Sequence, residues 1–172
     1  MQGLKILGID PGSRLMGYGV VGKAGTKLTA HAHGTLRFNT KVEANERLVE
    51  IYRRVKELIE TYEPDHVAIE KVFFAKNAVS SFKLGQARGV AILAVTERSI
   101  PLFEYSPNAV KQSVVGFGHA DKEQVATMVS RLVGAQKFES TDSSDALAIA
   151  ICHLHTYTYT SRIQKAIKEA GL

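Results

Sequence analysis

The chain of 172 residues is 45% hydrophobic and 23% charged, the composition of an ordinary globular domain with a proper core. Its 22 Lys and Arg against 17 Asp and Glu give a net charge of +5, which favours an anionic partner, although so small an excess could simply keep the protein soluble. A membrane span of roughly 18 apolar residues is excluded, and the apolar run before Asp10 is too short for a signal peptide. The single cysteine, Cys152, excludes an intrachain disulfide, so we expect a cytoplasmic protein with no membrane segment.

The first half of the chain is predicted to form three strands followed by one helix. Leu4–Ile9 is almost continuously apolar, as in a strand buried on both faces, and Gly17–Lys23 and Lys27–Phe38 follow as further strands. Apolar residues then recur at helical spacing over Ala44–Tyr62, and Pro64 stops this helix.

The second half alternates strands with helices. Strands are expected at His66–Glu70 and Leu102–Tyr105. Helices are expected at Val79–Arg98, from Ser106-Pro107 to Gly116, at Asp121–Val133 and at Ser140–Tyr157. Residues 158–172 form a tail that is either a marginal helix or mobile, so the domain spans residues 1–157. The order of elements predicts an α/β fold with a mixed five-stranded sheet flanked by helices.

Four acidic residues fall where these elements begin or end. Asp10 and Glu70 close the first and fourth strands, and Asp142 and Asp145 open the last core helix. We expect the first and fourth strands to be neighbours, which places their carboxyl ends side by side, and residues three apart share a helix face. Converged carboxylates raise one another's pKa unless a cation lies between them, and such oxygen ligands suit Mg²⁺ or Mn²⁺. A pair of these ions is the usual apparatus for cutting a phosphodiester.

Each acidic residue also has a simpler interpretation. Asp10 before Pro-Gly could be a turn residue, and Asp142 could be only the N-cap of its helix. The metal-site interpretation therefore depends on all four residues together. The string Cys152-His153-Leu154-His155 does not predict a second metal site, because adjacent residues on a helix point about 100° apart. Cys152 is expected to be a buried small hydrophobe.

Five strings, in order and without a large gap, resemble one known family. They are Leu7-Gly8-Ile9-Asp10-Pro11-Gly12-Ser13, Ala68-Ile69-Glu70-Lys71-Val72-Phe73, Lys83-Leu84-Gly85-Gln86-Ala87-Arg88-Gly89-Val90, Val110-Lys111-Gln112-Ser113-Val114-Val115-Gly116 and Asp142-Ser143-Ser144-Asp145-Ala146-Leu147-Ala148-Ile149-Ala150. Through them the chain resembles the RuvC Holliday-junction resolvases. The resemblance implies an RNase H-like fold and Mg²⁺-dependent, paired nicking of four-way DNA junctions in recombination and repair. It assigns metal binding and catalysis to Asp10, Glu70, Asp142 and Asp145, with two ions per site and Mn²⁺ as a substitute.

Five further residues are candidates for contact with DNA. Lys111 and Lys122 match basic family positions near the site, where they would contact phosphate or offset developing charge. The alternative is that both are solvated helix lysines. Phe73, just beyond the fourth strand, could stack on an unpaired base or pack into the core. Lys76 and Arg14 are further basic candidates for DNA binding.

The helix expected at Val79–Arg98 is rich in small residues, which permit close packing against either the sheet or a second subunit. The resemblance points to this helix as the contact of a homodimer. Two active sites related by a two-fold axis suit a junction that is itself nearly two-fold symmetric. The resemblance also suggests partnership with the RuvA–RuvB branch-migration complex.

Two other functions remain open at this point. An actin/hexokinase-like nucleotide-binding phosphotransferase also begins with a Gly-Ile-Asp-like strand, but it needs two such lobes, and 172 residues without an internal repeat supply one. A non-catalytic module that binds DNA junctions would not need four acids, which repel DNA. A metal-dependent nicking assay on a synthetic junction, with ATP hydrolysis as a control, separates the three.

Overall fold

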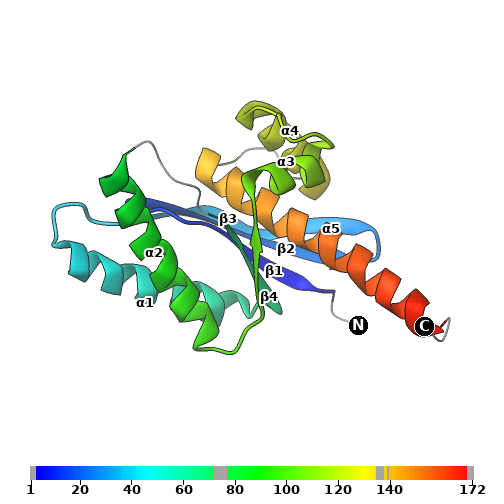
Figure 1. Cartoon of the computed structure of the whole chain (residues 1–172), viewed down its shortest axis with the longest axis horizontal. Coiled ribbons are helices and arrows are strands. Elements are labelled where there is room, and N and C mark those ends of the chain that lie inside the picture. The colour runs from blue at the N-terminus through cyan, green and yellow to red at the C-terminus, as the bar shows by residue number, and fades with distance from the viewer. Residues whose placement is uncertain (1–2, 72–76, 135–137, 139, 170–172) are drawn as a thin grey trace.

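A mixed five-stranded sheet forms the centre of the computed structural model, which describes residues 3–71, 77–134, 138 and 140–169 (Figure 1). The strands are β1 (Lys5–Asp10), β2 (Leu15–Ala24), β3 (Lys27–Arg37), β4 (His66–Glu70) and β5 (Leu102–Tyr105). Their order across the sheet is β3-β2-β1-β4-β5, so β1 lies in the middle. Each strand lies where the sequence predicts it, with ends that differ by at most two residues.

The two halves of the sheet differ in strand direction. β1 pairs antiparallel with β2, and β2 pairs antiparallel with β3. On its other side β1 runs parallel to β4, which runs parallel to β5. The expected contact between the first and fourth strands is therefore confirmed. Because β1 and β4 run in the same direction, they end at the same edge of the sheet.

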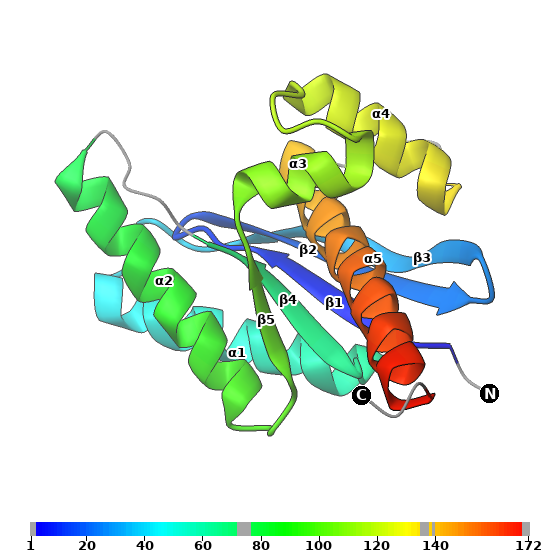
Figure 2. The same cartoon turned by 45° about the vertical axis from the view of Figure 1, so that its right-hand side comes forward.

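Helices cover both faces of this sheet (Figure 1, Figure 2). They are α1 (Ala44–Tyr62), α2 (Ala78–Thr96), α3 (Pro107–Val115), α4 (Lys122–Val133) and α5 (Thr141–Glu169). In both views α1 and α2 lie side by side on one face, whereas α5 crosses the other face and packs against α3 and α4. The predicted mixed sheet flanked by helices is thus confirmed.

Two apolar layers fill the space between the sheet and its helices. Successive side chains of a strand point to opposite faces. In β1, Leu7 and Ile9 enter the layer beneath α1 and α2, whereas Ile6 enters the layer beneath α5. All three side chains are buried, so the central strand is covered on both faces as its apolar sequence predicts.

Side-chain caps fix the starts of the two short helices. Ser106 Oγ accepts a backbone N–H three residues further on at 3.2 Å, and Pro107 occupies the first position of α3, as predicted. At the next helix Asp121 and Gln124 form a reciprocal capping box. This box fixes the position of Lys122, the first residue of α4.

The last helix, α5, continues to Glu169, well past the expected end at residue 157. The chain has no Gly or Pro between Thr141 and Glu169, so no residue of this stretch breaks the helix. Lys23 Nζ of β2 also donates a 3.0 Å hydrogen bond to the hydroxyl of Thr158, which anchors the helix beyond the expected end. Among the described residues, no helix is both long and apolar enough to cross a membrane.

Candidate active site

Asp10 and Glu70 are neighbours at one edge of the sheet. The parallel ladder of β1 and β4 ends with Ile9 opposite Ile69, and Asp10 and Glu70 are the next residues of the two strands. Ile9 and Ile69 enter the layer beneath α1 and α2. By alternation, the two acidic side chains project from the opposite face, which α5 covers.

Three glycines allow α5 to rest directly on this face. A Cβ atom at Gly17 would lie 2.0 Å from the backbone oxygen of Asp142, and one at Gly8 or Gly19 would lie 2.1 or 2.8 Å from other atoms of α5. Any side chain there would push the helix away from the sheet. The glycines therefore bring the start of α5, with Asp142 and Asp145, to the end of β1. Sequence analysis missed this role, because a glycine in a strand does not reveal which element approaches it.

Ser140, rather than Asp142, caps α5. Ser140 Oγ accepts the backbone N–H of Ser143 at 3.2 Å, and it shares a further hydrogen bond with the hydroxyl of Thr35 in β3. Asp142 lies within the first turn, where its negative charge is favourable near the positive end of the helix dipole. The interpretation of Asp142 as a simple N-cap is therefore wrong.

Burial and like charge perturb the carboxyl groups strongly. The pKa of Asp10 is raised to about 8, first by burial and then by the charges of Glu70, Asp145 and Asp142. The pKa of Glu70 is also raised, again first by burial and then by Asp145. The charges of the other three carboxylates thus all act on Asp10, and a cation among the four would relieve this repulsion.

Two lysines lie at the same site. Lys122 Nζ pairs with Asp145 Oδ2 at 3.1 Å, and Asp145 is the main reason that the pKa of Lys122 is raised. The charge of Lys111, on α3, partly offsets the rise in the pKa of Glu70. Both lysines line a cavity of about 300 Å³ together with Asp10, Glu70 and Asp145. They therefore do not lie on remote helix faces.

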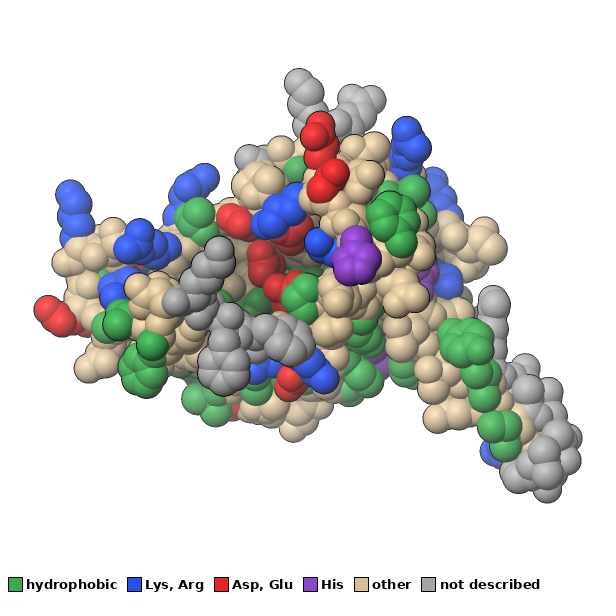
Figure 3. Space-filling model, turned by 45° about the horizontal axis from the view of Figure 1, so that its top comes forward, with side chains coloured by type: hydrophobic (Ala, Val, Ile, Leu, Met, Phe, Trp, Pro, Cys, Tyr) green, Lys and Arg blue, Asp and Glu red, His purple; other side chains and the backbone are tan. Residues whose placement is uncertain are grey.

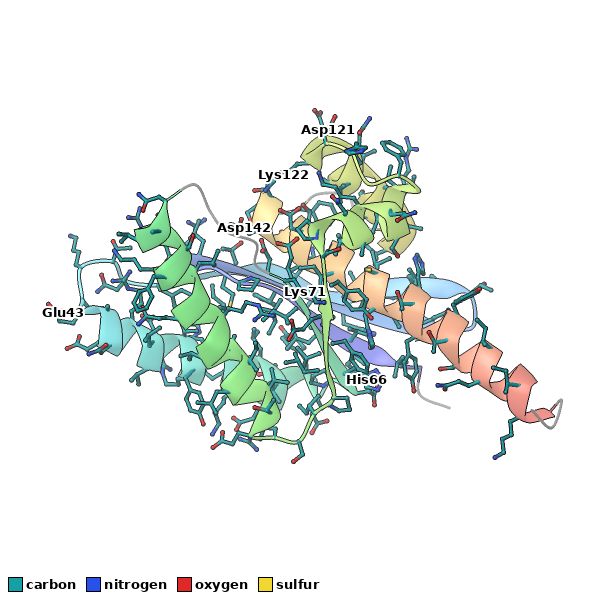
Figure 4. The ribbon with its side chains drawn as sticks, in the orientation of Figure 1. Glu43, His66, Lys71, Asp121, Lys122 and Asp142 are labelled. Atoms are coloured by element: carbon teal, nitrogen blue, oxygen red, sulfur yellow. The ribbon has the colours of Figure 1, made fainter. Side chains whose placement is uncertain are left out.

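The surface view shows where these charges are exposed. Figure 3 shows Asp and Glu side chains gathered in a hollow in the middle of one face, with Lys and Arg side chains around it. In Figure 4, Lys122 of α4 and Asp142 of α5 lie near each other, whereas His66, at the start of β4, lies far from both. An anionic substrate would therefore meet lysines around the hollow and carboxylates within it.

The donor chemistry of the site fits a divalent cation. All four acidic side chains offer hard carboxylate oxygens, which Mg²⁺ and Mn²⁺ prefer. Among the described residues, no three Asp, Glu, His or Cys side chains form a closed ligand cluster. The backbones of β1, β4 and α5 nevertheless bring the four carboxylates within electrostatic range of one another.

Of the three other residues expected to contact DNA, the structure describes only Arg14. Arg14 is exposed in the turn between β1 and β2, beyond the strand end that carries Asp10. Phe73 and Lys76 lie outside the described residues.

Sequence analysis also missed a buried polar chain on the α5 side of the sheet. His153 Nε2 lies 2.9 Å from His66 Nδ1, and His153 Nδ1 lies 2.7 Å from the hydroxyl of Tyr105. Burial lowers the pKa of His153 to about 4. Cys152 is buried, as expected, and His155 contacts α3 instead, so these adjacent side chains do not converge. Nothing in the sequence indicates that β4, β5 and α5 bring the three polar groups together.

Known proteins share both the sequence pattern and this fold. The family model for crossover junction endodeoxyribonuclease RuvC matches residues 6–153. The protein of that name from Klebsiella pneumoniae (strain 342) is 53% identical over 145 residues, which cover 84% of this chain and 83% of the relative. The one from Geobacter sulfurreducens is 47% identical over 146 residues, which cover 85% and 89%.

A solved structure agrees with these matches. The structure of T. thermophilus RuvC in complex with Holliday junction substrate matches with a TM-score of 0.84 and 35% identity, covering 90% of this chain and 94% of that one. The match confirms the expected RNase H-like fold. The chain therefore belongs to the RuvC family of crossover junction endodeoxyribonucleases.

Proposed function

We propose that the chain is a structure-specific endonuclease that resolves four-way DNA junctions by paired, metal-dependent nicks in homologous recombination and repair. The observation that carries the proposal is the meeting of carboxylates from β1, β4 and α5 at one cavity that also has two lysines in its wall. Family membership supports the same function and does not favour the phosphotransferase or the non-catalytic module.

The four carboxylates would hold the metal. Nucleases of this family depend on divalent metal ions, and we propose Mg²⁺, two ions per site, with Mn²⁺ able to replace it. When bound, the ions supply an activated water and stabilise the departing 3′ oxygen. Asp10, Glu70, Asp142 and Asp145 are the proposed ligands. With such a site, no nucleophilic Ser, Cys or His is required.

The two lysines would act on the scissile phosphate. Lys122 is 72% exposed although it pairs with Asp145, so its ammonium group is accessible to a phosphate that enters the cavity. Lys111 faces the same cavity from α3. Positive charges placed there would offset the negative charge that develops during cleavage. We therefore assign both lysines to phosphate contact and charge stabilisation.

Three further residues complete the proposed DNA contacts. Arg14 is exposed in the turn that follows β1, beyond the strand end with Asp10. Lys76 would contact the sugar-phosphate backbone of the DNA, and Phe73 would stack on a base near the crossover of the junction. Their place between Glu70 and α2 in the sequence supports this assignment.

The exposed face of α2 is the proposed contact of a homodimer. Phe82 and Leu93 are 67% and 58% exposed, and a Cβ atom at Gly85 or Gly89 would meet nothing within 4 Å. These two glycines therefore do not serve packing onto the sheet, which alanines on the opposite side of the helix provide. Residues at this spacing form one stripe along a helix. The stripe is smooth and apolar enough to pack against a second copy.

Three further assignments belong to this proposal. We take residues 1–157 as the nuclease domain and 158–172 as an accessory tail, since the family match ends at residue 153 and Tyr159 of the tail is 68% exposed. The RuvA–RuvB complex is the proposed branch-migration partner. The cytoplasm is the proposed compartment, in keeping with the single buried cysteine.

A nicking assay on a synthetic four-way junction tests the function. In Mg²⁺ the wild-type chain should nick opposite strands, whereas Asp10→Asn, Glu70→Gln, Asp142→Asn and Asp145→Asn should each abolish or nearly abolish nicking. Each change removes a ligand charge with little change of volume, so fold and junction binding should persist. Glu57→Gln on α1, an exposed residue of an ion pair, is the matched control and should nick normally. ATP hydrolysis without nicking would support the phosphotransferase instead.

A further inference from the structure

Arg88 of α2 holds the end of the strand that carries Glu70. Its Nε donates a 3.1 Å hydrogen bond to the backbone carbonyl oxygen of Glu70. Its Nη2 pairs with Glu104 Oε2 of β5 at 2.7 Å. The Arg88 side chain is only 18% exposed, so its guanidinium group is largely shielded from solvent, whereas Glu104 is 42% exposed. One guanidinium group thus links α2 to the ends of β4 and β5.

The Glu70 carbonyl needs this donor because the sheet does not supply one. The parallel ladder of β1 and β4 ends with Ile9 opposite Ile69. In such a ladder the next N–H available to the Glu70 carbonyl is that of residue 11. Residue 11 is Pro11, which has no backbone N–H. A shielded carbonyl oxygen left without a donor would be costly, and Arg88 supplies that donor.

Arg88 approaches from the face of the sheet opposite the carboxylates. Glu104 pairs in register with Ile69, whose side chain enters the layer beneath α1 and α2. By alternation Glu104 points to the same layer, and there it meets Arg88. Glu70 projects to the other face, toward α5. The guanidinium therefore fixes the backbone of Glu70 from behind without entering the metal site.

We propose that Arg88 is a positioning residue that orients Glu70 for metal binding by holding its backbone carbonyl in place of the missing ladder bond. The inference rests on the proposed function, since it assumes that Glu70 is a metal ligand. An arginine suits this role because its planar fork makes both bonds at once, which a lysine ammonium on a flexible stem does not reproduce.

Binding of Mg²⁺ alone, measured by titration calorimetry without DNA, tests the inference apart from catalysis. Arg88→Ala should weaken Mg²⁺ binding by about 10- to 100-fold, the usual cost of removing a partner that orients a metal ligand. Nicking should fall at low Mg²⁺ and recover as Mg²⁺ rises, while junction affinity stays unchanged. Arg88→Lys should bind Mg²⁺ with intermediate affinity. Arg53→Ala removes a similar ion pair on α1 and is the matched control, with wild-type Mg²⁺ affinity expected.

A second variant keeps the test decisive if Arg88→Ala does not fold. Glu104→Gln removes the charge that holds the guanidinium but leaves Arg88 in place, and it should weaken Mg²⁺ binding to a smaller extent. Wild-type Mg²⁺ affinity in a folded Arg88→Ala protein would overturn the inference, as would wild-type affinity in Glu104→Gln if Arg88→Ala does not fold. An equal loss of affinity in Arg53→Ala would overturn it as well. Such results would leave the proposed function intact if the wild-type chain nicks junctions. Absence of nicking by the wild-type chain would instead contradict the function itself.

Discussion

Gly17→Ala is the change that most directly tests how α5 builds the active site. The new Cβ atom would lie 2.0 Å from the backbone oxygen of Asp142, whereas ordinary van der Waals contact begins near 3.4 Å. The gap between β2 and the start of α5 must therefore widen by about 1.4 Å. No flexible side chain can yield here, because the obstacle is helix backbone.

The displacement should damage catalysis more than folding. The moving segment carries Asp142 and Asp145, and a misplacement of about 1 Å in a catalytic constellation costs on the order of 100-fold in rate. The strain itself should lower the free energy of unfolding by about 1–3 kcal/mol. We therefore expect a folded Gly17→Ala protein that binds junctions but nicks them roughly 100-fold more slowly.

Single-turnover nicking of a synthetic junction at saturating Mg²⁺ measures this effect, with thermal unfolding measured in parallel. Gly118→Ala is the matched control, because its Cβ atom would come no closer than 3.8 Å to any neighbour. The control should nick at the wild-type rate. A Gly17→Ala protein that is folded and nicks at the rate of the control would refute the idea that close contact between β2 and α5 positions the two carboxylates.

The remaining predictions concern charge, assembly and stability. Junction binding should weaken steeply as the salt concentration rises. Lys111→Ala and Lys122→Ala should each flatten the slope of the logarithm of the binding constant against the logarithm of the salt concentration by roughly one unit. An unchanged slope together with intact cleavage would show that the lysine is only a solvated surface residue. Gly89→Glu should sediment as a monomer and should convert a cruciform plasmid mainly to nicked rather than linear product, because it buries an unpaired charge in the dimer contact. Tyr159→Glu is the control and should remain dimeric. A monomer that still makes mainly linear product would contradict the role of this dimer. Burial lowers the pKa of His153 from 6.5 to about 4, so the unfolded chain binds the proton more tightly. The free energy of unfolding should therefore fall by up to about 3 kcal/mol as pH drops from about 6.5 toward 4. Urea titrations of the wild type and of His153→Gln over this range measure the effect. If both proteins lose the same free energy of unfolding, His153 is not the cause.

Local sequence signals predicted the elements that carry the acids. The helix Ala44–Tyr62 was expected with the bounds that the structure shows, because apolar residues keep helical spacing up to the stop at Pro64. Asp10 and Glu70 were expected to be neighbours because both follow buried apolar strands that the chain order makes adjacent. The structure confirms that the strands are adjacent, and the charge of Glu70 helps to raise the pKa of Asp10.

Contacts between distant segments could not be predicted in the same way. Gly17 gives no indication of a partner that lies 125 residues further along the chain, because its effect depends on which helix reaches it. The sequence does not distinguish Arg88 from other arginines. Its role becomes visible only in the structure, where Pro11 leaves the Glu70 carbonyl without a hydrogen-bond donor in the sheet and Arg88 supplies one. The sequence left residues 158–172 open between a marginal helix and a mobile tail, since these last turns are polar and their helicity depends on continuity with a buried helix.

Helix α5 is a single continuous helix from the active site to its C-terminal end. Its 29 residues span about 43 Å, from the turn that carries Asp142 to a distal part beyond the sheet where Tyr159 is 68% exposed. At Gly8 of β1 and at Gly17 and Gly19 of β2, the helix lies directly against the sheet. The same continuous helix therefore carries Asp142 and Asp145 at one end and an exposed segment at the other, and the Lys23–Thr158 hydrogen bond and the buried face of α5 hold the two ends in one fixed orientation on the sheet.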